Sequence, residues 1–217
     1  MWGVREEPRF RDRVDGGRQL AERLARYRAE RPLVFALPRG GVVVGYEVAA
    51  ALGAPLDVLV ARKVGAPGNP EYAIGAIAPG VTIINSNVVA DLGVPVSYIE
   101  ATVASEQQEL ERRVHAYRGG RPLEPVAGRT VIVVDDGLAT GATAAAALES
   151  MRKLGPSRLV FAAPVVAPGS DAALRGRADE VVWVLAPALF HAVGEFYDDF
   201  RATTDEEVVA LLKRGPS

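Results

Sequence analysis

The sequence predicts an α/β protein whose core is a doubly wound, mainly parallel sheet of about five strands. Short apolar runs alternate along the chain with longer segments that have the apolar periodicity of helices. The apolar runs are continuous, which indicates strands that are covered on both faces. Glycine-rich or polar turns follow several of these runs, at the positions where parallel strands pass into helices.

In the N-terminal half, the spacing of Leu20, Leu24 and Tyr27 predicts a helix that covers the sheet. A Gly/Pro-rich segment after the second apolar run predicts a surface loop, and Pro79-Gly80 predicts the turn of a hairpin. The expected elements are helix 15–28, strand 33–37, helix 41–52, strand 56–61, loop 65–70, and hairpin strands 72–78 and 81–84.

In the C-terminal half, Ile99, Val103, Leu110 and Val114 share one face of a long predicted helix. Thr204, followed three residues later by Glu, is typical of a capping box that starts the last helix. The expected elements are helix 97–117, strand 131–134, helix 143–154, strand 159–164, helix 171–178, strand 181–185 and helix 204–213.

These elements predict one domain, residues 1–217, with a Rossmann-like core at about 30–186. The chain ends, about 1–29 and 187–217, are left over from this core. Together with the hairpin, they are expected to form a small hood or cap.

Composition restricts the partners and the compartment. The formal net charge is -2, which argues against a nucleic-acid binder that depends on counterion release. The chain has no cysteine and its start, MWGVREEPRF, has no apolar signal core, so we expect a cytoplasmic protein. The longest apolar stretches, such as Val181–Phe190, fall short of the ~20 residues that a membrane helix needs, so no membrane association is expected.

The most informative motif is VIVVDDGLATGAT, Val131–Thr143. Asp135 and Asp136 stand at the carboxyl end of a buried strand, where open α/β sheets bind ligands. The following turn offers backbone N–H groups and hydroxyls to an anion at a helix N-terminus. Two carboxylates beside an anion site suit a ligand with sugar hydroxyls and a charge-neutralising metal.

This motif resembles the signature of type I phosphoribosyltransferases, which bind phosphoribosyl pyrophosphate (PRPP). The resemblance implies that Asp135 and Asp136 bind the ribose hydroxyls and contact Mg²⁺ mainly through substrate and water. It also implies a 5′-phosphate site. The residues of that site are Ala139, Thr140, Gly141, Ala142 and Thr143. Gly137 departs from the family pattern, which usually has an aliphatic residue there.

Two further strands end in groups that suit the same substrate. The segment LPRGG combines Arg39 with the amides of Gly40 and Gly41, and it resembles the pyrophosphate loop of the family. In several relatives a cis peptide precedes the basic residue, which here is the Pro38–Arg39 bond. Arg62 and Lys63 end the next strand, before a segment, residues 65–72, that resembles the family's flexible catalytic loop.

The C-terminal segment supplies candidates for acceptor binding. In the family, the residues after the last core strand often stack an aromatic ring on a base, so Trp183, Phe190 and Phe196 are candidates. Each ring could equally fill the core. His191 could contact the acceptor, although a lone histidine is more often structural.

The resemblance implies an Mg²⁺-dependent enzyme of nucleotide metabolism that transfers ribose 5-phosphate to a nitrogenous acceptor and releases pyrophosphate. Lys63, Arg39 and Asp136 are the expected catalytic residues, and a homodimer is expected. Ala139 replaces the acid that 6-oxopurine enzymes commonly use, so hypoxanthine and guanine are not the expected acceptors. A non-catalytic PRPP-binding regulator and a general nucleotide-binding protein remain as alternatives.

Overall fold

Five parallel strands form the central sheet, in the order β2-β1-β6-β7-β8. The structure is a computed structural model that describes residues 9–215. Residues 1–8, which belong to the expected hood, lie outside the described residues. The sheet strands are β1 (Leu33–Ala36), β2 (Leu56–Val58), β6 (Thr130–Val134), β7 (Arg158–Val165) and β8 (Glu180–Leu185). The predicted doubly wound α/β fold is therefore confirmed.

Helices cover both faces of the sheet, because successive strand side chains point to opposite faces. On one face, Ile132 and Val160 pack with α1 (Arg13–Leu24) and α2 (Gly40–Leu52). On the other face, Val133 packs with α5 (Ala142–Arg152). Burial of all five β6 residues explains why this strand reads as a continuous apolar run.

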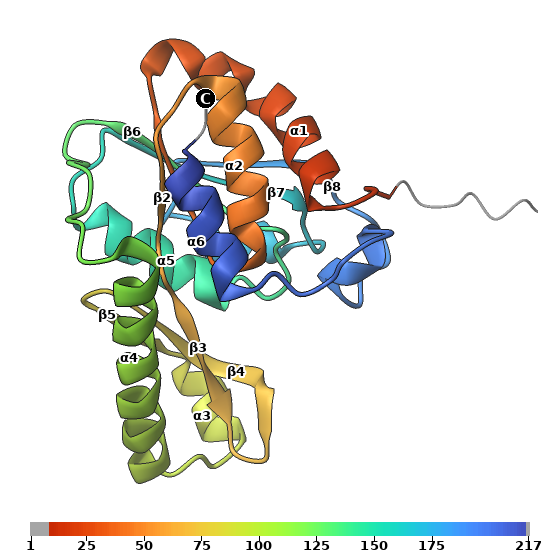
Figure 1. Cartoon of the computed structure of the whole chain (residues 1–217). Helices are drawn as coiled ribbons and strands as arrows, with labels where there is room; N and C mark the ends of the chain where they lie inside the picture. The colour runs from red at the N-terminus through yellow and green to blue at the C-terminus, as the bar shows by residue number, and fades with distance from the viewer. Residues whose placement is uncertain (1–8, 216–217) are drawn as a thin grey trace, which may run out of the picture.

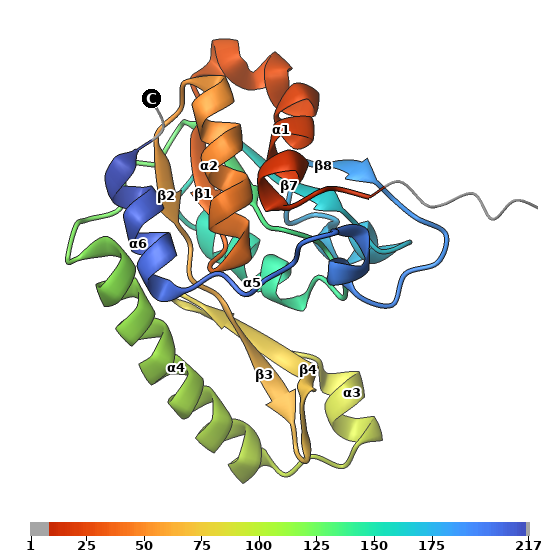
Figure 2. The same cartoon turned by 45° about the vertical axis from the view of Figure 1, so that its right-hand side comes forward.

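A second sheet contains three antiparallel strands in the order β3-β4-β5. Its strands are β3 (Arg62–Ala66), β4 (Asn69–Ala78) and β5 (Val81–Ile84). Together with α3 (Ser86–Asp91) and α4 (Val96–Arg118), it forms an arm that extends away from the central sheet (Figures 1 and 2). The arm is larger than the hairpin that the sequence predicts, since α3 was not expected.

The predicted loop 65–70 is wrong, because most of it is paired in a hairpin with its turn at Pro67-Gly68. Gly65 lies where a Cβ would meet the Pro70 carbonyl oxygen at 2.6 Å. Glycine and proline therefore permit a close strand approach with an irregular register, rather than an open loop. The predicted strand 56–61 pairs with the sheet only over β2.

Short 3-10 segments replace parts of two predicted helices. After α1 the chain continues as η1 (Ala25–Glu30), and the predicted helix 171–178 is only η2 (Ser170–Leu174). Gly176 has φ +74° just beyond η2, a conformation that ends helical structure.

The C-terminal segment contains η3 (Val193–Phe196) and α6 (Asp205–Arg214). In α6, Val208 and Leu212 pack in the same apolar cluster as α4 and α2 residues. Helix α1, which was expected in the hood, instead packs on α2, β7 and β8, and only its N-terminal end approaches the carboxyl edge of the sheet. None of the helices within residues 9–215 combines the length and apolar character needed to cross a bilayer.

The capping box of α6 gives a direct test of how this helix is held at its start. Thr204 accepts a hydrogen bond from the Glu207 N–H at 3.2 Å, and Glu207 accepts one from the Thr204 N–H at 2.7 Å. Thr204→Ala is expected to lower the free energy of unfolding by about 1 kcal/mol in urea titrations. The exposed Glu206→Ala change is the control, with an expected effect below about 0.5 kcal/mol. Equal losses in both variants would contradict this assignment.

Candidate functional site

The acid pair stands at the carboxyl end of β6, directly beside the loop that follows β1. A Cβ on Gly40 would collide with Asp136 Oδ2, and one on Gly41 would lie 2.9 Å from the Asp135 Cα. Only glycine permits this close approach of backbone to carboxylate. The structure therefore brings together two of the predicted groups, the acid pair and the Arg39-Gly40-Gly41 loop.

A cis peptide bond joins Pro38 and Arg39, as the family resemblance implies. The Leu37 N–H donates to the Val134 carbonyl at 2.8 Å, which keeps the loop level with the end of β6. Helix α2 starts at Gly40, so its first backbone N–H groups are directed toward the same edge as the acid pair.

Burial dominates the electrostatics of the two carboxyl groups. It raises the pKa of Asp135 well above the usual aspartate value, and the neighbouring charge of Asp136 raises it further. Burial also raises the pKa of Asp136, while the guanidinium of Arg13 opposes that rise. The Arg13 Nε lies 2.7 Å from Asp136 Oδ2. Sequence reasoning missed Arg13, which lies more than a hundred residues earlier in the chain.

In the turn after the acid pair, one residue is hydrogen-bonded to the neighbouring strand and the next two are exposed. The Leu138 N–H donates to the Val165 carbonyl at 2.9 Å, while Ala139 and Thr140 are exposed. Gly141 has φ +77° and precedes the first residue of α5. The N–H groups of the first turn have no acceptor within the helix, so Ala142 and Thr143 lie where an anion would be bound.

Arg62 and Lys63 do not end a strand of the central sheet, as the sequence predicted, because they start β3 of the second sheet. Residues next to them lie beside α5. Ala61 and Ala76 pack in one apolar cluster with Ala142 of α5, and Lys63 pairs with Ala76 across the hairpin. Arg62 forms an ion pair with Glu106 of α4, with its Nε 2.6 Å from the carboxylate. Helix α4 thus contacts the start of β3, the strand that carries both cations.

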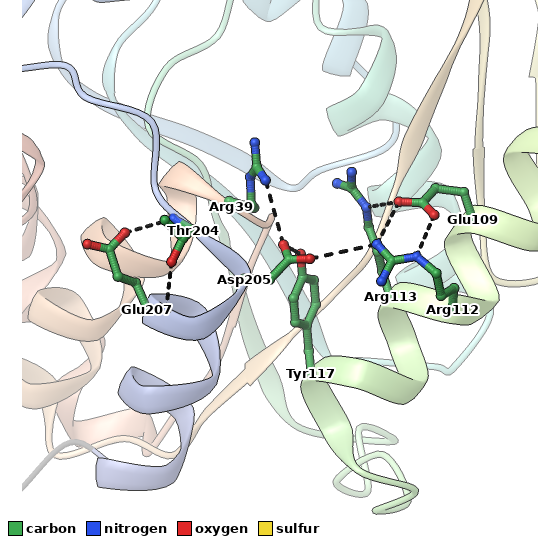
Figure 3. Close-up of polar contacts among 8 residues, drawn as sticks. All are labelled: Arg39, Glu109, Arg112, Arg113, Tyr117, Thr204, Asp205 and Glu207. Atoms are coloured by element: carbon green, nitrogen blue, oxygen red, sulfur yellow. Dashed lines mark hydrogen bonds and ion pairs between the residues drawn. The ribbon is translucent and has the colours of Figure 1, made fainter.

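Arg39 belongs to a polar network that connects three elements (Figure 3). Its Nη1 lies 3.7 Å from Asp205 Oδ1 at the start of α6. Tyr117 of α4 donates a hydrogen bond to the same carboxylate oxygen at 2.6 Å, and Arg112 lies 3.7 Å from the other. Asp205, which sequence reasoning missed, therefore links the glycine loop to the arm.

The pKa shifts in this network follow its contacts. The hydrogen bond from Tyr117 is the main cause that lowers the pKa of Asp205. Burial, followed by that same bond, raises the pKa of Tyr117 to about 12. Hydrogen bonds from Arg112 and Arg113 lower the pKa of Glu109 to about 2. Asp205 and Glu109 are therefore ionised near neutral pH, while Tyr117 keeps its proton and is neutral. Arg39 is thus paired with a carboxylate that a ligand anion could replace.

The predicted acceptor residues lie in two different places. Trp183 is central in the edge strand β8, opposite Ala163, and its exposed fraction is 37%. Phe190 stacks on Phe196 with ring centroids 5.4 Å apart, and His191 is exposed beside Glu195. The structure does not bring Trp183 together with the other candidates at the carboxyl edge.

The C-terminal segment packs directly on the signature turn. A Cβ on Gly137 would collide with the side chain of Val193, so Val193 occupies the space that an aliphatic residue at position 137 would need. Tyr197 donates its hydroxyl proton to the Asp136 carbonyl at 2.6 Å. The departure of Gly137 from the family pattern is thus matched by a contact from the C-terminal segment.

A cavity of about 580 Å³ lies beside this site and shares Arg13 with it. Its other walls come from α2, α6 and the preceding segment, including Val43, Glu207 and Thr203. Asp135 and Asp136 do not line this cavity.

One edge of the sheet thus carries an acid pair, a glycine loop and the N-terminus of a helix. This arrangement is typical of α/β proteins that bind phosphorylated ligands at the carboxyl ends of their strands. Residues 10–199 match the phosphoribosyl transferase domain, and the chain belongs to this family. It is 48% identical over 206 residues to proteins of Mycobacterium tuberculosis, strains H37Rv and CDC 1551 / Oshkosh, whose names assign them provisionally to the phosphoribosyl transferases.

That similarity covers 94% of this chain but 46% of each mycobacterial protein, so the chain spans about half the length of these relatives. The crystal structure of TT1426 from Thermus thermophilus is similar over nearly the whole chain. Its sequence identity is 46%, its TM-score is 0.79, and the match covers 95% of this chain and 98% of that one.

The contact between Gly137 and Val193 predicts a compensating pair of substitutions. Gly137→Ala is expected to lower the free energy of unfolding by about 1–3 kcal/mol, because the new methyl group collides with Val193. Val193→Ala in the same chain should recover part of that loss, which a thermal-unfolding double-mutant cycle would measure. Strictly additive losses would mean that the two positions do not share this space.

Proposed function

We propose that this domain is an Mg²⁺-dependent phosphoribosyltransferase that transfers ribose 5-phosphate from PRPP to a nitrogenous acceptor and releases pyrophosphate. The observation that carries the proposal is the close approach of the Gly40-Gly41 loop to Asp135 and Asp136. Backbone amides that can bind an anion therefore lie close to carboxylates that can accept hydrogen bonds from hydroxyl groups. One small ligand could contact both. Family membership supports the same function.

Each part of PRPP has a proposed partner. Asp135 and Asp136 accept hydrogen bonds from the ribose hydroxyls, and the turn 139–143 binds the 5′-phosphate through the start of α5. Arg39, with the amides of Gly40 and Gly41, binds pyrophosphate. Arg62 and Lys63 complete the pyrophosphate site from the arm.

Cleavage of the bond from ribose C1 to pyrophosphate develops positive charge on the ribose and negative charge on the leaving group. Arg39 and Lys63 are proposed to stabilise the leaving pyrophosphate, and Asp136 to hold the ribose while charge develops. The hairpin formed by β3 and β4, called the arm hairpin below, has exposed residues 67–70 at its tip. It is proposed to exclude water when it closes over the site.

The residues fit a magnesium ion that is bound largely through the substrate. Mg²⁺ is commonly held by one or two carboxylates together with substrate phosphates and water. Among the described side chains, those of residues 9–70 and 72–215, no three acidic or histidine groups cluster closely enough to hold a metal alone. When bound, Mg²⁺ would neutralise charge on the pyrophosphate.

The acceptor is proposed to be a nitrogenous compound other than hypoxanthine or guanine. Ala139 has no group that could accept or donate a proton. Phe190, one of the predicted acceptor residues, is already stacked on Phe196. A cytoplasmic homodimer that binds neither nucleic acid nor membranes remains part of the proposal.

A PRPP-binding regulator on the same fold is the second candidate. Arg39 and Arg62 both form ion pairs with carboxylates, an arrangement that also suits a protein that binds PRPP without reaction. A pyrophosphate-release screen with PRPP, Mg²⁺, purines, pyrimidines, orotate and small amines separates the two. Release with one acceptor supports the enzyme, and tight PRPP binding without release supports the regulator.

Substitution of the acid pair tests the PRPP site itself. Asp136→Asn should weaken PRPP binding by about tenfold or more in calorimetry, because a charged hydrogen-bond acceptor is lost. Chelation of Mg²⁺ should weaken binding of the wild type as well. Glu124→Gln is the control, because this exposed residue precedes β6, at the opposite end of that strand from the acid pair. Unchanged affinity in a folded variant with both Asp135→Asn and Asp136→Asn would defeat the assignment.

The arm hairpin is expected to order when the substrate binds. Hydrogen exchange of residues 65–72 should slow on addition of PRPP and Mg²⁺, because the hairpin tip closes over the pyrophosphate. The turn at Pro79-Gly80, which joins β4 to β5, serves as the internal control. Equal exchange of residues 65–72 with and without ligand would count against a closing hairpin.

A further inference from the structure

Arg13 is a largely buried cation that no part of the proposed reaction has yet used. It is the first residue of α1, directly after the N-cap Asp12, and its side chain has an exposed fraction of 11%. Its Nε lies 2.7 Å from Asp136 Oδ2, and a Cβ on Gly40 would lie 2.6 Å from that Nε. Arg13 therefore lies against both Asp136 and the glycine loop.

Other contacts fix the guanidinium in place. Its Nη1 donates a hydrogen bond to the Arg201 carbonyl at 2.8 Å, and its central carbon lies 3.8 Å from the centre of the Phe200 ring. The Asp12 side chain accepts a hydrogen bond from the Asp15 N–H at 2.8 Å, which fixes the first turn of α1. A long side chain held at three points has lost the freedom that makes most surface ion pairs weak.

Each carboxylate of the acid pair has one oxygen that accepts a hydrogen bond and one oxygen that is available to a ligand. Asp136 Oδ2 is bonded to Arg13, and Asp135 Oδ1 accepts the Asp136 N–H at 2.8 Å. The hydrogen bonds and ion pairs of the described side chains, in residues 9–70 and 72–215, do not use Asp135 Oδ2 or Asp136 Oδ1. The Asp136 side chain keeps an exposed fraction of 18%, so a ligand can reach it. Two carboxylate oxygens are thus left for two hydroxyl groups.

We propose that Arg13 is a positioning residue for the ribose: it engages one oxygen of Asp136 and thereby presents the other to a ribose hydroxyl. The inference rests on the proposed function, since it takes PRPP as the ligand. It also gives α1 and the segment around Arg201 a role in substrate binding, because both hold the guanidinium. Arg13 acts through Asp136 and not through the phosphates.

The structure gives a reason for an arginine at this position. A planar guanidinium can donate to the carboxylate through Nε and to the Arg201 carbonyl through Nη1 at once. A lysine could pair with Asp136 but has one nitrogen for both acceptors. Glutamine would keep a donor without the charge.

The test measures binding of three probes in the presence of Mg²⁺, by calorimetry: PRPP, ribose 5-phosphate and pyrophosphate. Arg13→Gln should weaken PRPP and ribose 5-phosphate by about tenfold or more, because the Asp136 carboxylate loses its orientation. Pyrophosphate, which has no hydroxyl for the acid pair, should bind within about twofold of the wild type. Arg13→Lys should lie between Arg13→Gln and the wild type for the two ribose probes.

Arg11→Gln is the matched control, since Arg11 precedes the same helix and its side chain has an exposed fraction of 75%. It should leave all three affinities unchanged. In an Asp136→Asn chain, Arg13→Gln should add little to the loss of ribose 5-phosphate, because the two residues act as one unit. Thermal unfolding of every variant identifies those that remain folded, and Arg13→Lys carries the test if Arg13→Gln unfolds.

The outcomes are separable. If Arg13→Gln binds all three probes with wild-type affinity, the inference about Arg13 is wrong, while the proposed function still stands. An equal loss for pyrophosphate and ribose 5-phosphate also overturns it, since Arg13 would then support the whole site. A wild type that binds none of the three probes refutes the proposed function, and the inference falls with it.

Discussion

The arrangement of this site depends on the burial of two adjacent carboxylates at the end of a fully buried strand. Buried carboxylates are costly unless they are paired and hydrogen-bonded. Asp136 is paired with Arg13, and its backbone N–H is bonded to Asp135. Two oxygens in the same pair have no such bond among the described residues. The existing contacts therefore offset part of the cost of burying the two carboxylates and fix their position. The two remaining oxygens can accept hydrogen bonds from a ligand.

That constraint organises elements far apart in the chain. The start of α1 supplies the guanidinium, the C-terminal segment supplies the Arg201 carbonyl and the Phe200 ring, and Tyr197 fixes the backbone of Asp136. Glycines 40 and 41 let the loop after β1 come close to both carboxylates. Asp205 then connects that loop, through Arg39, to the arm. A change in the arm could therefore reach the loop through two contacts.

The sequence predicted those parts of the fold that local patterns determine. The strand–acid pair–turn–helix order around Asp135 follows from apolar runs and turn residues, and so does the hairpin turn at Pro79-Gly80. Local reading failed where glycine and proline serve packing, as at Gly65 and Pro70, which lie within paired strands. It also missed Arg13 and Asp205, because nothing near an exposed-looking charge reveals a partner that folding brings from a distance. The signal for Arg13 is the preceding N-cap Asp12, which fixes where α1 begins.

A crystal structure with ribose 5-phosphate and Mg²⁺ would show whether this sheet edge binds a phosphorylated ribose. The phosphate should lie on the amides of residues 139–143, at the start of α5. The 2′- and 3′-hydroxyls should donate to Asp135 and Asp136. A ligand bound at another place, or one whose phosphate lies on the acid pair while its hydroxyls face solvent, would rule out this site.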